Sequence, residues 1–260
     1  MRATICQLAT EAAGREAQWA VLAEHLRRER SDFLLLPEMP FNRWLAAERA
    51  VDTDAWAAAV AAHEGWIARI GELGVPAAAG TRPVVDGGHR HNRAWVWHAG
   101  RGHEDVHDKY YLPDEPGYWE ASWYQPAPAP LFEPCLAGDA RAGFQICTEM
   151  WFMQHARAYG EAGAQLVLVP RATPHESIDK WLAGGRAAAV VAGAFCLSSN
   201  LYAPPGSAAN LGGLGFICDP EGEVLATTSP DAPFATVEID LGQADTAKQT
   251  FPRYVRTQSN

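Results

Sequence analysis

Three segments of the sequence contain a reactive side chain in a position that can be both fixed and accessible. In two of them the side chain directly follows a run typical of a buried strand, and in the third it lies beside aromatic residues. Glu38 follows the apolar run 34–37, and Cys147 follows the run 143–146. Lys109 precedes two tyrosines and a leucine. In such places a strand fixes the side chain while the following loop leaves access to it.

The carboxylate of Glu38 is a candidate general base. Pro37 and Pro40 flank it and restrict its backbone. Burial disfavours the charged form of a carboxylate, which makes it a better proton acceptor. The alternative is an exposed glutamate at a strand end, because charged side chains usually face solvent.

The ammonium of Lys109 is a candidate for stabilising a developing oxyanion. Only three lysines occur among the 21 basic residues, and Lys109 is the one beside Tyr110, Tyr111 and Leu112. A compact point charge suits an oxyanion, whereas the planar fork of an arginine would not occupy the same place. The alternative is a lysine whose stem is buried and whose charge reaches solvent.

Among the cysteines, Cys147 has the best position for a nucleophile. It lies between a predicted strand and a predicted helix, where backbone N–H groups and the helix dipole favour a thiolate. The alternative is a buried structural thiol, which is how we interpret Cys6, Cys196 and Cys218. Five dispersed cysteines without a C-x-x-C spacing predict reduced thiols, with no disulfide framework and no zinc site.

In order, spacing and flanking residues, the three segments resemble the nitrilase, or carbon–nitrogen hydrolase, superfamily. The resemblance runs from residue 1 to about 240 and includes the segments 162–170 and 213–222. It implies that Glu38 is the general base, Lys109 the catalytic lysine and Cys147 the nucleophile. The segment 109–120 looks most like that of N-carbamoylputrescine amidases, which implies that Glu120 is a second glutamate that positions the substrate and the lysine.

The resemblance implies a cysteine-dependent amidohydrolase that cleaves a small non-peptide amide or an N-carbamoyl amine through a thioester. It implies no metal and no organic cofactor, and a homodimer or larger homo-oligomer. Two alternatives stay open. An amine instead of water could resolve the thioester, which would make the chain an acyltransferase, or the protein could bind ligands without turnover.

The substrate is the open point, because the residues expected around the pocket depart from the family pattern at Asp108, Thr148, Glu149 and the segment 184–191. Thr148 and Glu149 are the candidate substrate-binding residues, and the backbone N–H of Thr148 is expected to help hold the oxyanion. If Glu149 faces the pocket, it favours a cationic substrate group, so carbamoylated amines should bind better than carbamoylated amino acids. Alternatively, Glu149 caps or ion-pairs within its own helix.

Strand-like and helix-like segments alternate along the chain. Amphipathic helices are predicted over 16–30, 54–73, 151–162 and 180–193, and strands over 2–9, 32–37, 75–80, 92–98, 142–146, 165–170, 194–200, 213–219, 223–228 and 235–240. This pattern predicts an α/β fold, and the resemblance specifies the four-layer α-β-β-α sandwich of the nitrilase type. We expect a single domain over 1–260, with 241–260 as a polar C-terminal tail.

The composition argues against other classes of partner. The 260 residues carry a formal charge of −10, which disfavours nucleic acid and anionic membrane as partners. The sequence shows no secretory segment, and its longest apolar stretch, 187–197, is too short to span a bilayer, so we expect a cytoplasmic protein with a small-molecule substrate.

Other candidate metal or catalytic sites have weaker support in the sequence. The histidines at 89, 91, 98, 103 and 107 crowd one region without a carboxylate at metal-ligand spacing, so we expect surface histidines. A pair of Cys147 with His155 or His175 lacks the local cysteine signature of papain-like proteases. The chain has no G-x-S-x-G elbow and no Walker sequence, and the glycines at 212–215 enter a strand rather than a helix.

Overall fold

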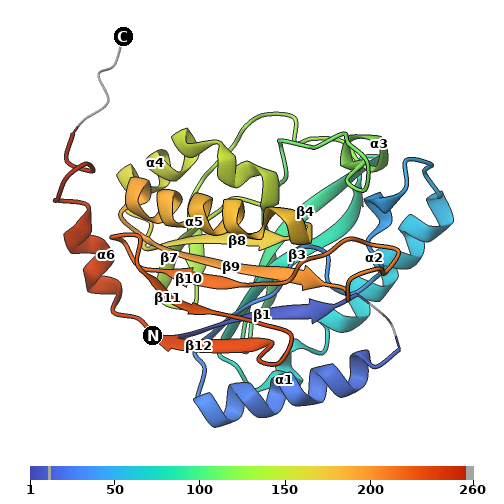
Figure 1. Ribbon diagram of the computed structural model, residues 1–260, viewed down its shortest axis with the longest axis horizontal. Helices are drawn as coiled ribbons and strands as arrows, with labels where there is room; N and C mark the ends of the chain where they lie inside the picture. The colour runs from blue at the N-terminus through green and yellow to red at the C-terminus, as the bar shows by residue number, and fades with distance from the viewer. Residues whose placement is uncertain (11–12, 256–260) are drawn as a thin grey trace.

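The computed structural model describes residues 1–10 and 13–255, and its main feature is a long mixed sheet in two facing halves (Figure 1). The first half contains β1 (Arg2–Ala9), β2 (Phe33–Leu35), β3 (Ala77–Asp86), β4 (His89–His98), β5 (Gly102–Asp108) and β12 (Phe234–Glu238). The second half contains β6 (Cys135–Ala137), β7 (Ala140–Phe144), β8 (Leu166–Arg171), β9 (Phe195–Tyr202), β10 (Phe216–Cys218) and β11 (Val224–Thr227).

Strand β1 joins the two halves. Its residues 3–5 pair in parallel with β2, whereas its residues 7–9 pair in parallel with β9. The continuous order is β5-β4-β3-β2-β1-β9-β8-β7-β6. Because the pairing changes partner along a single strand, the sheet turns at β1 and its two halves can face each other.

The main hydrophobic core lies between the two halves. Phe33 and Ala79 from the first half belong to the same buried cluster as Phe144 and Leu168 from the second. Apolar side chains on both inner faces are removed from water together, which is the principal favourable term in such a sandwich.

Helices cover both outer faces of the sheet. On the first half, α1 (Arg15–Glu29) and α2 (Thr53–Ile67) contribute side chains to a second buried cluster that includes Leu34 and Leu36 of the sheet. On the second half, α4 (Met153–Glu161) and α5 (Ile178–Ala192) lie against the strands (Figure 1). The four layers are therefore α-β-β-α, which confirms the fold predicted from the sequence.

Two glycines of α5 allow this helix to lie close to its neighbours. A Cβ atom at Gly185 would lie 2.1 Å from the ring of Phe216, and one at Gly184 would lie 2.7 Å from Met150. The unusual glycine pair in the segment 184–191 thus has a packing reason, because α5 lies directly over β10 and over the turn that carries the cysteine.

The C-terminal residues depart from the polar tail that the sequence predicted. Residues 241–247 form α6 (Leu241–Ala247), in which Ala244 and Ala247 are buried. Two small apolar residues three positions apart were too weak a signal to reveal a packed helix. The last predicted tail residues, 256–260, lie outside the described residues.

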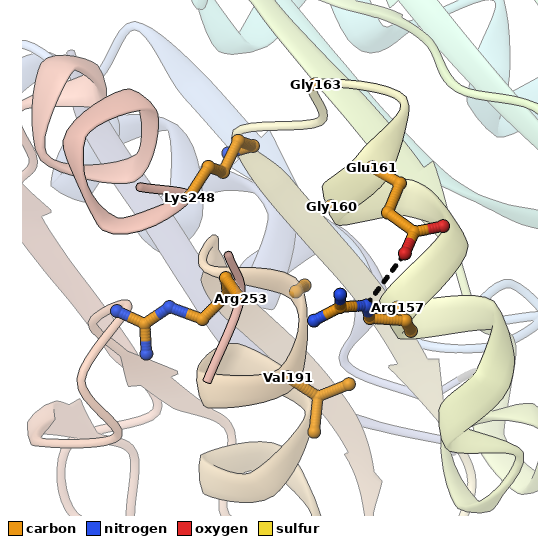
Figure 2. Close-up of a pocket in the computed structure, with 8 residues that line it drawn as sticks. Arg157, Gly160, Glu161, Gly163, Val191, Lys248 and Arg253 are labelled. Atoms are coloured by element: carbon orange, nitrogen blue, oxygen red, sulfur yellow. Dashed lines mark hydrogen bonds and ion pairs between the residues drawn. The ribbon is translucent and has the colours of Figure 1, made fainter. Parts of the chain in front are cut away.

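The segment after α6 packs against the ends of α4 and α5 around a cavity of about 230 Å³ (Figure 2). Two basic side chains that line this cavity donate hydrogen bonds to backbone carbonyls. Lys248 Nζ donates to the carbonyl of Gly193 at 3.0 Å, and Arg157 Nη1 donates to the carbonyl of Pro252 at 3.4 Å. The carbonyl of Gly193 lies at the C-terminus of α5, where carbonyls lack partners inside the helix, so Lys248 caps it. Arg157 instead connects α4 to the C-terminal segment.

Besides α6, three strands or α-helices of the described residues were not predicted from the sequence. They are β5, β6 and the single-turn helix α3 (Glu120–Trp123). Most side chains of β5 are exposed and polar, so an apolar alternation does not mark it. Within the described ranges, no helix has both the length and the apolarity needed to cross a bilayer.

Candidate active site

Three ionisable side chains meet in the interior at the ends of separate elements. Glu38 follows β2, Lys109 follows β5, and Glu120 begins α3, and all three side chains have no exposed surface. Lys109 Nζ lies 2.8 Å from Glu38 Oε1 and 2.6 Å from Glu120 Oε2. The structure therefore brings together three of the residues that the sequence singled out, with one ammonium between two carboxylates.

Two further residues complete this cluster, and sequence reasoning missed both. Asn92 Nδ2 on β4 donates a 2.7 Å hydrogen bond to Glu38 Oε1. The hydroxyl of Tyr124 donates to Glu120 Oε2. A polar residue at the start of an apolar strand was a signal for Asn92, but nothing near Tyr124 in the sequence marks it.

Each carboxylate keeps one oxygen without a partner. Glu38 Oε2 and Glu120 Oε1 are buried and accept no hydrogen bond from the described residues. A buried acceptor without a donor costs free energy, so such an atom in a cavity wall is a candidate for contact with a ligand. The held oxygens fix the two carboxylates, and the free oxygens remain available for chemistry.

The charges of the cluster act on one another. Burial alone would lower the pKa of Lys109, but the carboxylates of Glu120 and Glu38 outweigh it and raise the pKa, so the ammonium stays charged. Burial raises the pKa of Glu120 to about 7, with Lys109 opposing this rise and the charge of Glu38 adding to it.

Cys147 lies at a sharp turn beside this cluster. It begins the 3₁₀ helix η3 (Cys147–Trp151), and its φ of 50° places it in the left-handed region that non-glycine residues rarely adopt. The residue before it is extended and the turn follows directly, so the sulfur is held at the bend. Such strained positions are concentrated at functional sites.

The thiol environment differs from the sequence-based expectation of a thiolate. Cys147 is 3% exposed, and burial, with a contribution from the charge of Glu38, raises the pKa of its thiol. Lys109 and the backbone of Ala172 oppose this rise but are weaker. A short 3₁₀ turn also offers a weaker dipole than the predicted helix. The resting group is a neutral thiol, which needs a base.

Glu149 does not face the pocket, so the predicted substrate-binding role is wrong. Its carboxylate is fully buried, and it accepts hydrogen bonds from the backbone N–H of Tyr110 at 2.7 Å and of Ile146 at 2.8 Å. These two residues adjoin Lys109 and Cys147 in the chain. Of the two alternatives weighed from the sequence, the cap within its own turn is the one observed. One carboxylate thus fixes both the segment that carries Lys109 and the segment that carries Cys147.

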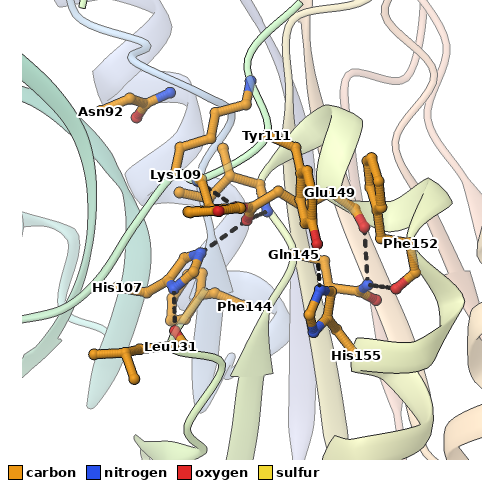
Figure 3. Close-up of polar contacts among 12 residues, drawn as sticks. Asn92, His107, Lys109, Tyr111, Leu131, Phe144, Gln145, Glu149, Phe152 and His155 are labelled. Carbon is orange, nitrogen blue, oxygen red and sulfur yellow. Dashed lines mark hydrogen bonds and ion pairs between the residues drawn. The ribbon is translucent and has the colours of Figure 1, made fainter. Parts of the chain in front are cut away.

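His107 was predicted at the surface, and this prediction is also wrong. Its Nε2 lies 2.8 Å from Glu149 Oε2, and its Nδ1 lies 3.1 Å from the carbonyl of Leu131 (Figure 3). Burial alone would lower the pKa of His107, but Glu149 outweighs it and the pKa is raised. Both ring nitrogens face acceptors, so the ring is an imidazolium. Figure 3 shows the ammonium end of Lys109 pointing away from this pair.

A cavity of about 290 Å³ opens beside Cys147 and the buried cluster. Cys147, Glu120 and Thr148 line it, which agrees with the placement of Thr148 predicted from the sequence. Its other lining residues include three aromatic side chains and two charged ones at the exposed rim, namely Tyr118, Trp151, Trp181, Glu115 and Lys180. Among the described residues, no three His, Cys, Asp or Glu side chains form a metal-binding group.

A family model described as carbon–nitrogen hydrolase matches residues 2–249. Among curated proteins, the chain is similar to citrullinase from Francisella tularensis subsp. tularensis, with 33% identity over 133 residues, 46% of each protein. It is also similar to N-carbamoylputrescine amidase from Arabidopsis thaliana, with 26% identity over 161 residues, 56% of this chain and 54% of the relative. The match thus spans about half the length of these relatives.

The fold is similar to that of a carbon–nitrogen hydrolase from Helicobacter pylori G27. The two structures superpose with a TM-score of 0.85 at 20% identity, over 98% of this chain and 94% of the other. Agreement at such low identity concerns the arrangement of elements.

Proposed function

Because the chain belongs to the carbon–nitrogen hydrolase family, we propose that it is a cysteine-dependent amidohydrolase acting on a small non-peptide amide or N-carbamoyl amine. The observation that carries the proposal is the buried cluster beside Cys147, in which Lys109 holds Glu38 and Glu120 at 2.8 and 2.6 Å. A neutral thiol, a carboxylate with one free oxygen and a fixed ammonium are the parts that acyl transfer through sulfur requires.

In the first step, Glu38 Oε2 takes the proton of the Cys147 thiol as the sulfur attacks the carbonyl carbon of the substrate. A C–S bond forms, and the carbonyl electron pair moves onto the oxygen. An ammonium has three N–H donors, and Lys109 uses two of them on carboxylates. The third N–H, together with the backbone N–H of Thr148, stabilises the oxyanion.

In the second step, Glu38 returns the proton to the substrate nitrogen, the C–N bond breaks, and the amine or ammonia leaves. The product on the enzyme is a thioester. Water then gives a proton to Glu38 and attacks the same carbon, the C–S bond breaks, and the sulfur recovers the proton. The free Oε1 of Glu120 lies in the cavity wall, where it accepts an N–H of the substrate amide.

For the substrate, we favour a compound with a terminal ureido group and an ammonium at its far end. The names of the two curated relatives, citrullinase and N-carbamoylputrescine amidase, refer to molecules of this kind. With Glu149 turned away from the cavity, the rim carboxylate of Glu115 is the group that would meet the ammonium. Lys180 at the same rim would contact a substrate carboxylate located next to that ammonium.

Product analysis tests this function. An N-carbamoyl amine yields ammonia, carbon dioxide and a free amine, whereas a simple amide yields ammonia and an acid. We expect ammonia and carbon dioxide in equal amounts from carbamoylated diamines or ureido amino acids, and neither from the Cys147→Ser variant. Ammonia without carbon dioxide from every active compound would contradict the ureido substrate, and no turnover of any amide would contradict the amidohydrolase.

Within that experiment, the rim residues distinguish two substrate types. Glu115→Gln should raise KM for carbamoylated diamines and ureido amino acids alike. Lys180→Gln should raise KM only for substrates with a carboxylate. Unchanged KM values in both variants would show that the rim charges do not select the substrate.

A further inference from the structure

A buried arginine without an ion-pair partner lies behind the catalytic cluster. Arg171 ends β8 and is 1% exposed. Its guanidinium donates to Ser198 Oγ at 2.6 Å, to Thr173 Oγ1 at 2.9 Å and to the carbonyl of Leu214 at 2.7 Å. All these acceptors are neutral, and within the described ranges no carboxylate comes within ion-pair distance of it.

Such a charge is costly unless its surroundings compensate it. Transfer of an unpaired ion into a protein interior costs several kcal/mol, even after relaxation. The rings of Trp181 and Phe216, with centroids 5.4 and 5.0 Å from the guanidinium carbon, offset part of this cost. An apolar side chain at the end of β8 would avoid the cost entirely, so the charge of Arg171 requires compensating negative charge nearby.

The backbone around Arg171 contacts the catalytic residues. Its carbonyl accepts the N–H of Glu38 at 3.3 Å, and the backbone of the next residue, Ala172, lies against the thiol of Cys147. Thr173, which receives one of its hydrogen bonds, lines the cavity. Arg171 is therefore adjacent to the cluster without touching its reacting atoms.

The titratable groups that act on the guanidinium are Cys147, Cys196 and Glu38. Burial, the strongest influence, lowers the pKa of Arg171 to about 10, and these three groups oppose it. The side chain is therefore a cation at neutral pH. Cys147 and Cys196 are buried thiols with raised pKa values, so Glu38 is the group among the three that carries negative charge at neutral pH.

When both of its carboxylates are ionised, the cluster carries one excess negative charge. Glu38 and Glu120 contribute two negative charges, and Lys109 contributes one positive charge. We propose that Arg171 is a positioning residue whose buried positive charge offsets this excess and so keeps Glu38 available as the base for Cys147. Without it, the cluster would relieve its excess charge by binding a proton, and the base that serves Cys147 would be lost. This inference rests on the proposed role of Glu38.

The test measures the reactivity of Cys147 and requires no known substrate. Iodoacetamide labels the thiol, and mass spectrometry of the Cys147 peptide gives its alkylation rate as a function of pH. On the acid limb of this profile, Arg171→Gln should react about tenfold more slowly than wild type at the same pH, because the limb moves up by about one pH unit. Arg171→Lys keeps the charge and should stay within about threefold of the wild-type rate.

Arg253→Gln is the matched control. Arg253, labelled in Figure 2, is also buried. Its guanidinium donates to the carbonyl of Ala247 in α6 and to Glu221. Its loss should lower the melting temperature and leave the alkylation profile of Cys147 unchanged. An acid limb in Arg171→Gln that coincides with that of the wild type would overturn the role of Arg171.

If Arg171→Gln does not fold, a second substitution that restores folding tests the proposal instead. Removing one negative charge in the double variant Glu38→Gln/Arg171→Gln should restore a cooperative melting transition, and failure to do so overturns the proposal. Hydrolysis by wild-type protein that persists after complete alkylation of Cys147 would instead overturn the proposed function.

Discussion

Replacing Lys109 by methionine tests the buried cluster most fully. The side chain keeps its approximate length and loses its charge, which leaves Glu38 and Glu120 facing each other in the interior. Lys109 makes contacts of 2.8 and 2.6 Å to them, and all three side chains are fully buried. Removing one partner of a buried ion pair costs about 3–5 kcal/mol, because an uncompensated charge remains.

The expected change in melting temperature follows from chain length. A chain of 260 residues has an unfolding entropy of about 0.5 kcal/mol/K near 60 °C. The loss of about 3–5 kcal/mol therefore lowers the melting temperature by about 6–9 °C. Scanning calorimetry or circular dichroism measures this shift. Lys180→Met is the control, because Lys180 is an exposed rim residue, and its change should be below about 1 °C.

The pH dependence has a definite sign. Burial already raises the pKa of Glu120 to about 7, against the opposing effect of Lys109. Without the ammonium this pKa rises further, so the folded variant holds a proton that the unfolded chain has released above about pH 4.5. A raised folded-state pKa of a carboxyl contributes stability that is lost as the pH rises. The difference from wild type should therefore be larger at pH 8 than at pH 6. An equal loss at both pH values would refute the reasoning.

Three further changes test separate parts of the account. Cys147→Ser should fold with a normal melting temperature and lose at least about 10³-fold in kcat, because a hydroxyl is a poor nucleophile with a carboxylate base; appreciable turnover would place the nucleophile elsewhere. Glu149→Gln should lower the free energy of unfolding by about 1–3 kcal/mol and reduce kcat more than KM, as followed by urea titration and steady-state kinetics; an effect on KM alone would contradict its role as a clamp. Gly185→Ala should lose about 1–3 kcal/mol through the contact with Phe216, whereas Gly65→Ala, in open space, should not be destabilised.

The sequence was most informative where a local pattern determines structure. The helix predicted over 16–30 is observed as α1 (Arg15–Glu29), and the strands predicted over 75–80 and 92–98 overlap β3 and β4, which pair with each other. Amphipathic periodicity and turn chemistry act over neighbouring residues, so they can be recognised in a linear sequence.

The errors concern groups whose partners come from distant elements. His107 is buried because β5 and the turn after β7 bring it to Glu149, 42 residues away. Glu149 is buried because it accepts bonds from two loops, one of which carries Lys109. Neither environment follows from the flanking residues. The same holds for Arg171, whose neutral partners lie on β9 and on the loop before β10.

The most direct test of the central claim is to trap the acyl-enzyme. Protein mixed with an excess of an active amide and quenched in acid should show an added mass equal to the acyl group of the substrate. Digestion should place that mass on the peptide containing Cys147, and hydroxylamine should remove it, as expected of a thioester. Hydrolysis that proceeds at the normal rate with no acyl group on Cys147 at any time, or with the group on another residue, would contradict the assignment of Cys147 as the nucleophile.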